Sequence, residues 1–206
     1  MPEFQNHFHF NPQASTYSSP SLIPAAEISS FHQDFPGYSQ TPLIRLPALS
    51  AELKVRAVCV KDESSRFGLP SFKILGASWG AFRALVQYYE LSLDCSLEGL
   101  RQTVRRRTVS LYAATDGNHG RAVARFARVI DAQALIYVPK GMERETVALI
   151  EGEGATVVKT ELSYDEVVTR AFGDAGCTGG IVVQDTAFEG YEEVPRVNSQ
   201  VLRRVR

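Results

Sequence analysis

The sequence contains little cysteine: Cys59, Cys95 and Cys177 are its three thiols, and no two of them form a Cys-x-x-Cys pair. An odd number of widely spaced cysteines argues against a disulfide framework and against a zinc site, and it is typical of a reducing compartment. We therefore predict no metal site, and we expect the protein in the cytoplasm.

Long apolar runs and an excess of charge of either sign are also absent. No stretch approaches the roughly 18 uninterrupted apolar residues that a membrane span requires. No Lys or Arg precedes Arg45, which argues against a secretory or transit segment. The net charge of -1 provides no field that would attract nucleic acid or an anionic membrane. The sequence thus predicts a soluble protein that binds neither nucleic acid nor membranes.

The pattern along the chain predicts an α/β fold. Residues 1–30 are rich in Ser, Pro, Asn, Gln and Ala, which indicates a flexible leader. After about residue 54, β-prone runs alternate with helical patterns, which predicts right-handed βαβ crossovers and a mainly parallel sheet with helices on both faces. The expected strands are 55–60, 108–114, 134–138, 156–159 and 181–184, and the expected helices are 74–89, 118–130, 143–151 and 164–175.

The first of these helices carries small residues on one face. Gly76, Ala77, Gly80, Ala81 and Ala84 recur at helical spacing. A face without large side chains lets a helix approach another backbone, or a flat ligand, closely.

Open α/β sheets bind ligands at the carboxyl ends of their strands, so polar residues at strand ends are the candidate site residues. Lys73 lies in SFKILG, at a predicted helix start between an aromatic residue and an apolar turn. Partial desolvation there favours the neutral, nucleophilic amine that Schiff-base chemistry needs. The same position equally suits a lysine whose stem merely lies along an amphipathic helix.

Two further segments, ATDGNHG and VQDTAFEGY, follow predicted strands. The amides of Gly117, Asn118 and His119 would be free donors at a helix start, where a carboxylate or phosphate binds readily. Asp116 and Asp185 would bring two acids to one cleft. Taken alone, Asp116 is as well explained as an N-cap and Asp185 as a turn former.

Together these segments resemble a known family. SFKILG resembles the cofactor-lysine segment of the fold-type-II pyridoxal-phosphate (PLP) enzymes, which share the architecture of the tryptophan synthase β-subunit. ATDGNHG has an aspartate before its glycine where most members have serine. With KDESSRFGLPSFK, VVQDTAFEGYEEVP and FHQDFPGYSQTPLIRL, it is similar to the diaminopropionate ammonia-lyases. The resemblance covers residues 31–195, includes a smaller α/β domain at about 96–178, and leaves 196–206 as a divergent tail.

The resemblance implies a set of binding residues. Lys73 would hold PLP through a Schiff base, and Asn118 would contact the hydroxyl of the cofactor ring. Thr115, Gly117 and His119 would bind the carboxylate of a small amino-acid substrate.

The resemblance also implies a reaction, the elimination of ammonia from 2,3-diaminopropionate to give pyruvate and ammonia. Asp116 and Asp185 would be the two acid/base residues, acting on opposite faces of the D- and L-substrates. The full-length form would be a homodimer. A serine/threonine dehydratase-like β-eliminase is the alternative within the family, and aspartate at 116 argues against it.

Family members also carry a glycine-rich loop for the PLP phosphate in their C-terminal half. The glycine pair of this chain, Gly179 and Gly180, precedes a predicted strand and is expected to be a connector. The residues after Pro195 do not resemble the family's continuation. We therefore expect a truncated chain that is inactive or impaired alone, and a non-catalytic fragment stays a third interpretation.

Overall fold

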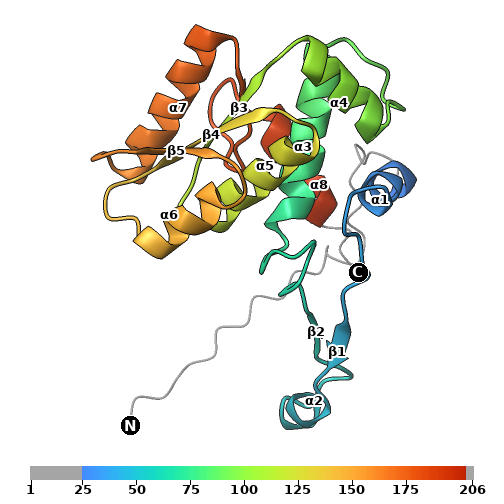
Figure 1. The fold of residues 1–206 in the computed structure, drawn as a ribbon. Helices are drawn as coiled ribbons and strands as arrows, with labels where there is room; N and C mark the ends of the chain where they lie inside the picture. The colour runs from blue at the N-terminus through green and yellow to red at the C-terminus, as the bar shows by residue number, and fades with distance from the viewer. Residues whose placement is uncertain (1–24, 203–206) are drawn as a thin grey trace.

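The computed structural model describes residues 25–202 (Figure 1). A four-stranded parallel sheet lies at its centre, in the order β5-β4-β3-β6. Its strands are β3 (Ser110–Ala114), β4 (Gln133–Val138), β5 (Thr156–Lys159) and β6 (Ile181–Val182). The parallel sheet confirms the fold class predicted from the alternating pattern.

Helices cover both faces of this sheet. On one face α7 (Tyr164–Thr178) packs on β3, β4 and β6, and on the other α5 (Asn118–Val129) packs on β3 and β4 while α6 (Arg144–Glu151) packs on β5. All but the first residue of β3 are buried, as expected for a central strand covered on both sides.

A further layer lies outside α5. There α3 (Lys73–Tyr88) packs on α5, and α8 (Glu193–Leu202) packs on α3 (Figure 1). The small-residue face of α3 meets α8: a Cβ at Gly76 would lie 3.4 Å from Cβ of Asn198, and one at Gly80 would collide with the Asn198 amide. The small-residue face of α3 therefore approaches the backbone of another helix, α8, one of the two possibilities that the sequence left open. Helix α4 (Leu97–Arg106) precedes β3 in the chain.

The N-terminal part contributes two short helices and a hairpin. Strands β1 (Leu43–Arg45) and β2 (Cys59–Lys61) pair antiparallel, with α2 (Pro47–Glu52) between them, and α1 (Ala25–Gln33) packs near α3. In Figure 1 the hairpin and α2 extend away from the parallel sheet.

Two boundaries in the N-terminal part differ from the sequence prediction. Helix α1 begins within the leader expected at 1–30, because its apolar residues Ile28 and Phe31 are buried; residues 1–24 lie outside the described part. The strand expected at 55–60 is limited to β2, because the amides of Val55 and Val58 donate to Ser50 instead of to a neighbouring strand.

The C-terminal boundaries also shift. Residues 196–202 of the expected tail belong to α8, where Val197 and Val201 are buried. Strand β6 adds to the sheet just beyond the domain limit expected at 178. Gly179 ends α7 in the left-handed conformation, with a φ of 69°, and so Gly179–Gly180 is the connector that the sequence predicted. Within residues 25–202, none of the helices is both long and apolar enough to cross a membrane.

Candidate active site

The site lies at the carboxyl ends of the parallel strands and centres on an ion pair. Lys73, the first residue of α3, donates from its amine to the carboxylate of Asp185, which follows β6. Their side chains are 38% and 23% exposed, so a small molecule can reach both. Burial opposes ionisation of Asp185, but interactions with its neighbours, the Lys73 ammonium among them, outweigh it and hold the Asp185 pKa below its usual range.

The loop after β3 is closed by a buried threonine. The hydroxyl of Thr115 accepts hydrogen bonds from the amides of Gly117 and Gly120, at 2.9 and 3.0 Å. Gly117 has a φ of +153°, and a Cβ at Gly120 would collide with Thr115 and with Ile136. Both glycines are thus needed for the turn into α5, and the Thr115 oxygen is committed to the loop rather than exposed to a ligand.

Asp116 and Asn118 are the exposed side chains of this loop. Gly117 occupies the N-cap position without a side-chain cap, so Asp116 is not the N-cap that its position also suggested. The first amides of a helix have no partner within the helix. Asp116, Asn118 and the start of α5 therefore present a carboxylate, an amide and backbone donors together.

The side chain of His119 does not point to where a substrate carboxylate was expected. Its ring is buried, and Nε2 lies 2.8 Å from the carbonyl oxygen of Val183. Nδ1 lies 3.6 Å from the Asp185 carboxylate. Burial lowers the pKa of His119 in spite of the neighbouring negative charge of Asp185. The ring faces β6 and Asp185, and its backbone amide alone remains at the helix start.

Two residues of this region were not identified from the sequence. Gln184 is 1% exposed; its amide nitrogen donates to the Tyr164 hydroxyl at 2.9 Å, and its amide oxygen accepts from Ala114 at 3.2 Å. Burial, followed by the charges of Asp185 and Asp116, raises the pKa of Tyr164. A glutamine inside a buried strand run was the signal available in the sequence.

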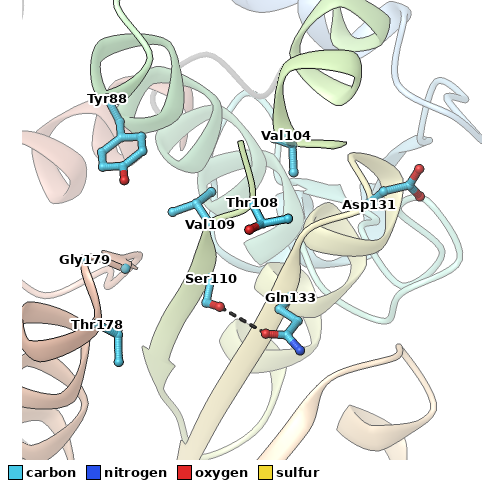
Figure 2. Close-up of a pocket in the computed structure, with 10 residues that line it drawn as sticks. Tyr88, Val104, Thr108, Val109, Ser110, Asp131, Gln133, Thr178 and Gly179 are labelled. Carbon is cyan, nitrogen blue, oxygen red and sulfur yellow. Dashed lines mark hydrogen bonds between the residues drawn. The ribbon is translucent and has the colours of Figure 1, made fainter. Parts of the chain in front are cut away.

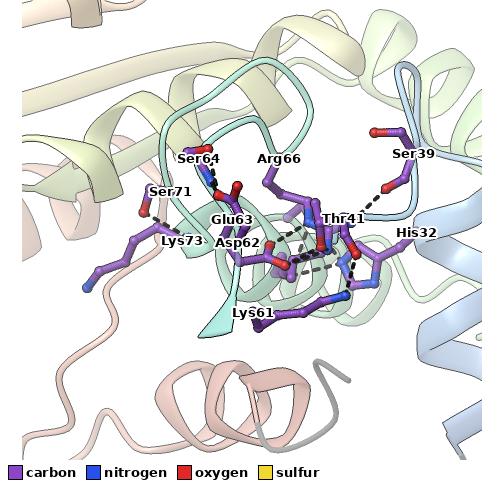
Figure 3. A network of polar contacts seen from close by, with 12 residues as sticks. His32, Ser39, Thr41, Lys61, Asp62, Glu63, Ser64, Arg66, Ser71 and Lys73 are labelled. Atoms are coloured by element: carbon purple, nitrogen blue, oxygen red, sulfur yellow. Dashed lines mark hydrogen bonds and ion pairs between the residues drawn. The ribbon is translucent and has the colours of Figure 1, made fainter. Parts of the chain in front are cut away.

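A polar network supports the segment that leads into Lys73 (Figure 3). Arg66 donates to both carboxylate oxygens of Glu63, at 2.6 and 2.7 Å, and to the hydroxyl of Thr41 at 2.6 Å. Burial opposes ionisation of Glu63, but the hydrogen bonds from Arg66 and Thr41 outweigh it and hold the Glu63 pKa low. The turn before α3 is therefore tied to the chain around residue 41.

A second tie joins this turn to α5. Phe67 adopts a φ of 52°, which is unusual for a residue with a large side chain. Its carbonyl accepts from Arg125 at 2.7 Å, and Arg125 also donates to Glu153 at 2.5 Å. Because Arg125 belongs to α5, these contacts fix the distance between the Lys73 turn and the loop that carries Asp116.

A cavity of about 570 Å³ lies at the opposite, amino ends of the strands (Figure 2). Its polar groups largely satisfy one another: Ser110 donates to Gln133 at 3.2 Å, and Asp131 pairs with Arg101 and Arg105. Among residues 25–202 no group of three or more His, Cys, Asp or Glu side chains could hold a metal ion.

Comparison with known proteins assigns this arrangement to a class. Residues 35–191 match the model of the family described as pyridoxal-phosphate dependent enzymes. The chain belongs to this family, and pyridoxal phosphate is its cofactor. Its structural neighbours are the fold-type-II members of that class.

The similarity is to one group within the family. The chain is 39% identical to diaminopropionate ammonia-lyase from Escherichia coli K12 over 187 residues, 90% of this chain and 46% of the relative. It is 37% identical to the Salmonella typhimurium LT2 protein of the same name, over 82% of this chain and 43% of that one. The crystal structure of the holo Escherichia coli enzyme superposes with a TM-score of 0.81 at 36% identity, covering 91% of this chain and 49% of that one. The chain therefore spans about half the length of the curated relatives it matches.

The described residues fit the reactive end of the cofactor. Lys73 offers an accessible primary amine with a carboxylate beside it that can take up a proton. The exposed Asn118 side chain lies at the start of α5, where it can donate a hydrogen bond to a ring hydroxyl. These are the two contacts that the sequence resemblance implied for the aldehyde and the neighbouring hydroxyl.

Proposed function

We propose that this chain carries the lysine and the acid/base residues of an enzyme that eliminates ammonia from 2,3-diaminopropionate. The observation that carries the proposal is the Lys73–Asp185 ion pair, which lies at the same end of the parallel sheet as a second carboxylate, Asp116. The names of the curated relatives support the substrate.

The chain's own residues would bind and orient the reactants. PLP, when bound, supplies the electron sink that makes the Cα–H of an amino acid acidic. Lys73 would hold the cofactor covalently, and Asn118 would contact the hydroxyl of its ring. The backbone amides of Asn118 and His119 would bind the substrate carboxylate, because helix N-termini favour anions; the Gly117 amide, also expected there, instead donates to the Thr115 hydroxyl.

The two carboxylates would move the protons. Elimination requires a base that removes the Cα proton and an acid that delivers a proton to the departing amine. Asp116 follows β3 and Asp185 follows β6, so they approach the cleft from different strands. We propose that Asp116 serves the D-isomer and Asp185 the L-isomer.

Charge favours a diamine over a hydroxy amino acid as the substrate. Diaminopropionate carries a second ammonium group, and carboxylates beside it provide charge-assisted hydrogen bonds. A serine at position 116, the usual residue of the dehydratases that resemble this chain, would not. With water, one diaminopropionate yields one pyruvate and two ammonia, whereas serine yields one of each.

The proposed function also has a cellular location and an oligomeric state. We propose that the enzyme acts in the cytoplasm, and all three cysteines of the chain are free thiols in the described structure. We propose a homodimer for the full-length form, with a small amino acid as substrate.

The test is to fuse the chain at Pro195 to the second half of the Escherichia coli relative and to add PLP. D- and L-diaminopropionate should then each release two ammonia for each pyruvate. Ammonia release from these substrates should be faster than ammonia release from L-serine or L-threonine. Faster turnover of the hydroxy amino acids would instead indicate a dehydratase. A fusion that binds PLP and turns over none of these substrates would support the non-catalytic interpretation.

A further inference from the structure

His119 is held in one orientation by two neighbours from the same segment. Its Nε2 lies 2.8 Å from the carbonyl oxygen of Val183. A carbonyl oxygen can only accept, so Nε2 carries a hydrogen atom. In the neutral ring Nδ1 therefore has a lone pair, and this lone pair faces the Asp185 carboxylate at 3.6 Å.

Two arrangements of one proton are available to this group. In the arrangement observed, the Lys73 ammonium donates to the Asp185 carboxylate, and Nδ1 of His119 has no hydrogen to donate. In the other arrangement an N–H bond of Lys73 breaks and an O–H bond of Asp185 forms. Lys73 becomes a neutral amine, and the new carboxylic acid keeps its proton and donates a hydrogen bond to Nδ1 of His119.

We propose that the ring of His119 is a positioning group that stabilises the proton taken by Asp185 from Lys73, and that it does not contact the substrate carboxylate. This inference rests on the proposed function, since Lys73 must lose a proton before its amine can attack the cofactor's aldehyde. Histidine suits the role because the Val183 carbonyl fixes which ring nitrogen accepts.

The surroundings of His119 contain few other ionisable groups. Lys73 faces it from α3, Asp185 from the segment after β6, and Asp116 from the loop after β3. Tyr164, at the start of α7, faces the two aspartates. Burial lowers the pKa of His119, so near neutral pH its ring is the neutral acceptor that the proposal requires.

Two substitutions separate the proton role from a merely structural one. In His119→Gln the side-chain amide can still donate to Val183, but nothing accepts at the place of Nδ1. In His119→Asn the shorter amide places an oxygen near the position of Nδ1, and the bond to Val183 is lost. If His119 is only structural, His119→Gln should keep cofactor attachment and His119→Asn should lose it. If His119 accepts the hydrogen bond from Asp185, His119→Asn should keep attachment and His119→Gln should lose it.

The readout is attachment of the cofactor, which does not depend on turnover. The chain of residues 1–206 is incubated with excess PLP over a range of pH and trapped with borohydride, and the Lys73 adduct is quantified by peptide mass. We expect His119→Gln to form this adduct about tenfold more slowly near neutral pH, the scale of one buried hydrogen bond, and to recover as pH rises. His119→Asn should retain the wild-type pH profile.

Adduct formation near neutral pH at the wild-type rate in His119→Gln, together with slow formation in His119→Asn, would overturn the proposal. Long-range ¹H–¹⁵N spectra of histidine-labelled chain give an independent check, since the hydrogen of His119 should be on Nε2 near neutral pH. A hydrogen on Nδ1, or a ring that titrates as in an unfolded chain, would also overturn it. If the adduct and spectroscopic results are as expected but the fusion does not turn over diaminopropionate, the proposed function is contradicted and the inference about His119 is not.

Discussion

The Lys73 amine and the Asp185 carboxylate form an ion pair although 112 residues separate them in the chain. Lys73 begins α3, and Asp185 follows the strand at the end of the sheet next to β3. Parallel strands bring successive carboxyl ends to one edge, so the crossovers between the two residues create the pair. Any change that alters the sheet order would separate the amine from its proton acceptor.

Lys73 should be the residue that attaches the cofactor. Its side chain is accessible and faces a proton acceptor, whereas Lys140 pairs with Glu161 at 3.4 Å in a highly exposed position. Borohydride reduction and peptide mapping should put the pyridoxyl mass on Lys73, and Lys73→Ala should remove it. Lys140→Ala is the matched control and should change nothing. Label on Lys54, Lys61 or Lys140 in the native chain would contradict the assignment.

Asp116 and Asp185 should divide the two substrate isomers in the fusion with the relative's second half. One base does not easily reach the protons on both faces of a planar group. Asp116→Asn should lower turnover of the D-isomer, and Asp185→Asn that of the L-isomer, each by about 10²-fold or more, the scale of a lost general base. Turnover of each isomer by each variant is the measurement. Equal loss for both isomers in both variants would indicate a shared structural role.

Much of the sheet could be predicted from sequence because its strands and helices have clear periods. The predicted strand 156–159 and the helix start at Asn118 agree with the structure. The α3 segment was displaced by only one residue. Helices α1, α2, α4 and α8 were not predicted. Two of them depend on tertiary contacts: α1 is helical where its apolar residues are buried, and α8 is helical where it packs on α3.

The site residues were predictable by position but not by orientation. Lys73, Asp116 and Asp185 lie at one edge of the sheet, as strand ends predict. The orientation of His119 could not be inferred, because it depends on a carbonyl 64 residues away in the chain. Tyr164 was missed for the same reason, since its role depends on Gln184 and on the charges of the two aspartates.

Asn198 should destabilise the chain. It is 4% exposed, and within the described residues neither its amide nitrogen nor its amide oxygen has a hydrogen-bond partner. A buried polar group without a partner costs about 1–3 kcal/mol. Asn198→Leu, which keeps the branching and the number of side-chain heavy atoms, should therefore raise the free energy of unfolding by roughly that amount.

The measurement for Asn198 is denaturant unfolding, with Gly80→Ala as a coupled variant. A Cβ at Gly80 would collide with the Asn198 amide, so Gly80→Ala should destabilise the native chain more than it destabilises Asn198→Ala. Additive effects of the two substitutions would show that α8 does not pack on this face of α3.

Acidification should weaken the turn before Lys73. Burial opposes ionisation of Glu153 and Glu63, but hydrogen bonds and charges from Arg125 and Arg66 hold both pKa values low. A pKa that is lower in the folded state gives stability that is present above the unfolded value, about 4.3 for Glu. This stability is lost as pH falls below that value through the folded pKa.

The check is thermal unfolding followed from about pH 7 downward. Glu153→Gln should lower the midpoint near neutral pH and reduce its dependence on acid. Glu161→Gln is the control, because the Glu161 side chain is 87% exposed in its pair with Lys140, and pairs of that kind contribute little. An acid dependence that is unchanged in Glu153→Gln would show that the Arg125 contacts do not stabilise the fold.

Residues 1–206 alone should turn over little or no diaminopropionate and should associate. Large apolar side chains are exposed together in and around the β1–β2 hairpin: Leu43, Ile44, Leu53, Val55 and Val60. Exposed apolar surface of this kind promotes association. Among residues 25–202 the outer strand edges of the two-stranded hairpin also have no pairing strand.

The measurement for residues 1–206 is light scattering with PLP present, together with pyruvate release from both isomers of diaminopropionate. We expect association, and turnover far below that of the fusion. Replacing Ile44 and Val60, which pair across the hairpin, by threonine should reduce association without restoring activity, because neither residue contributes a side chain to the Lys73–Asp185 ion pair. A monomeric chain with turnover equal to the fusion would show that residues 1–206 already contain everything the reaction requires.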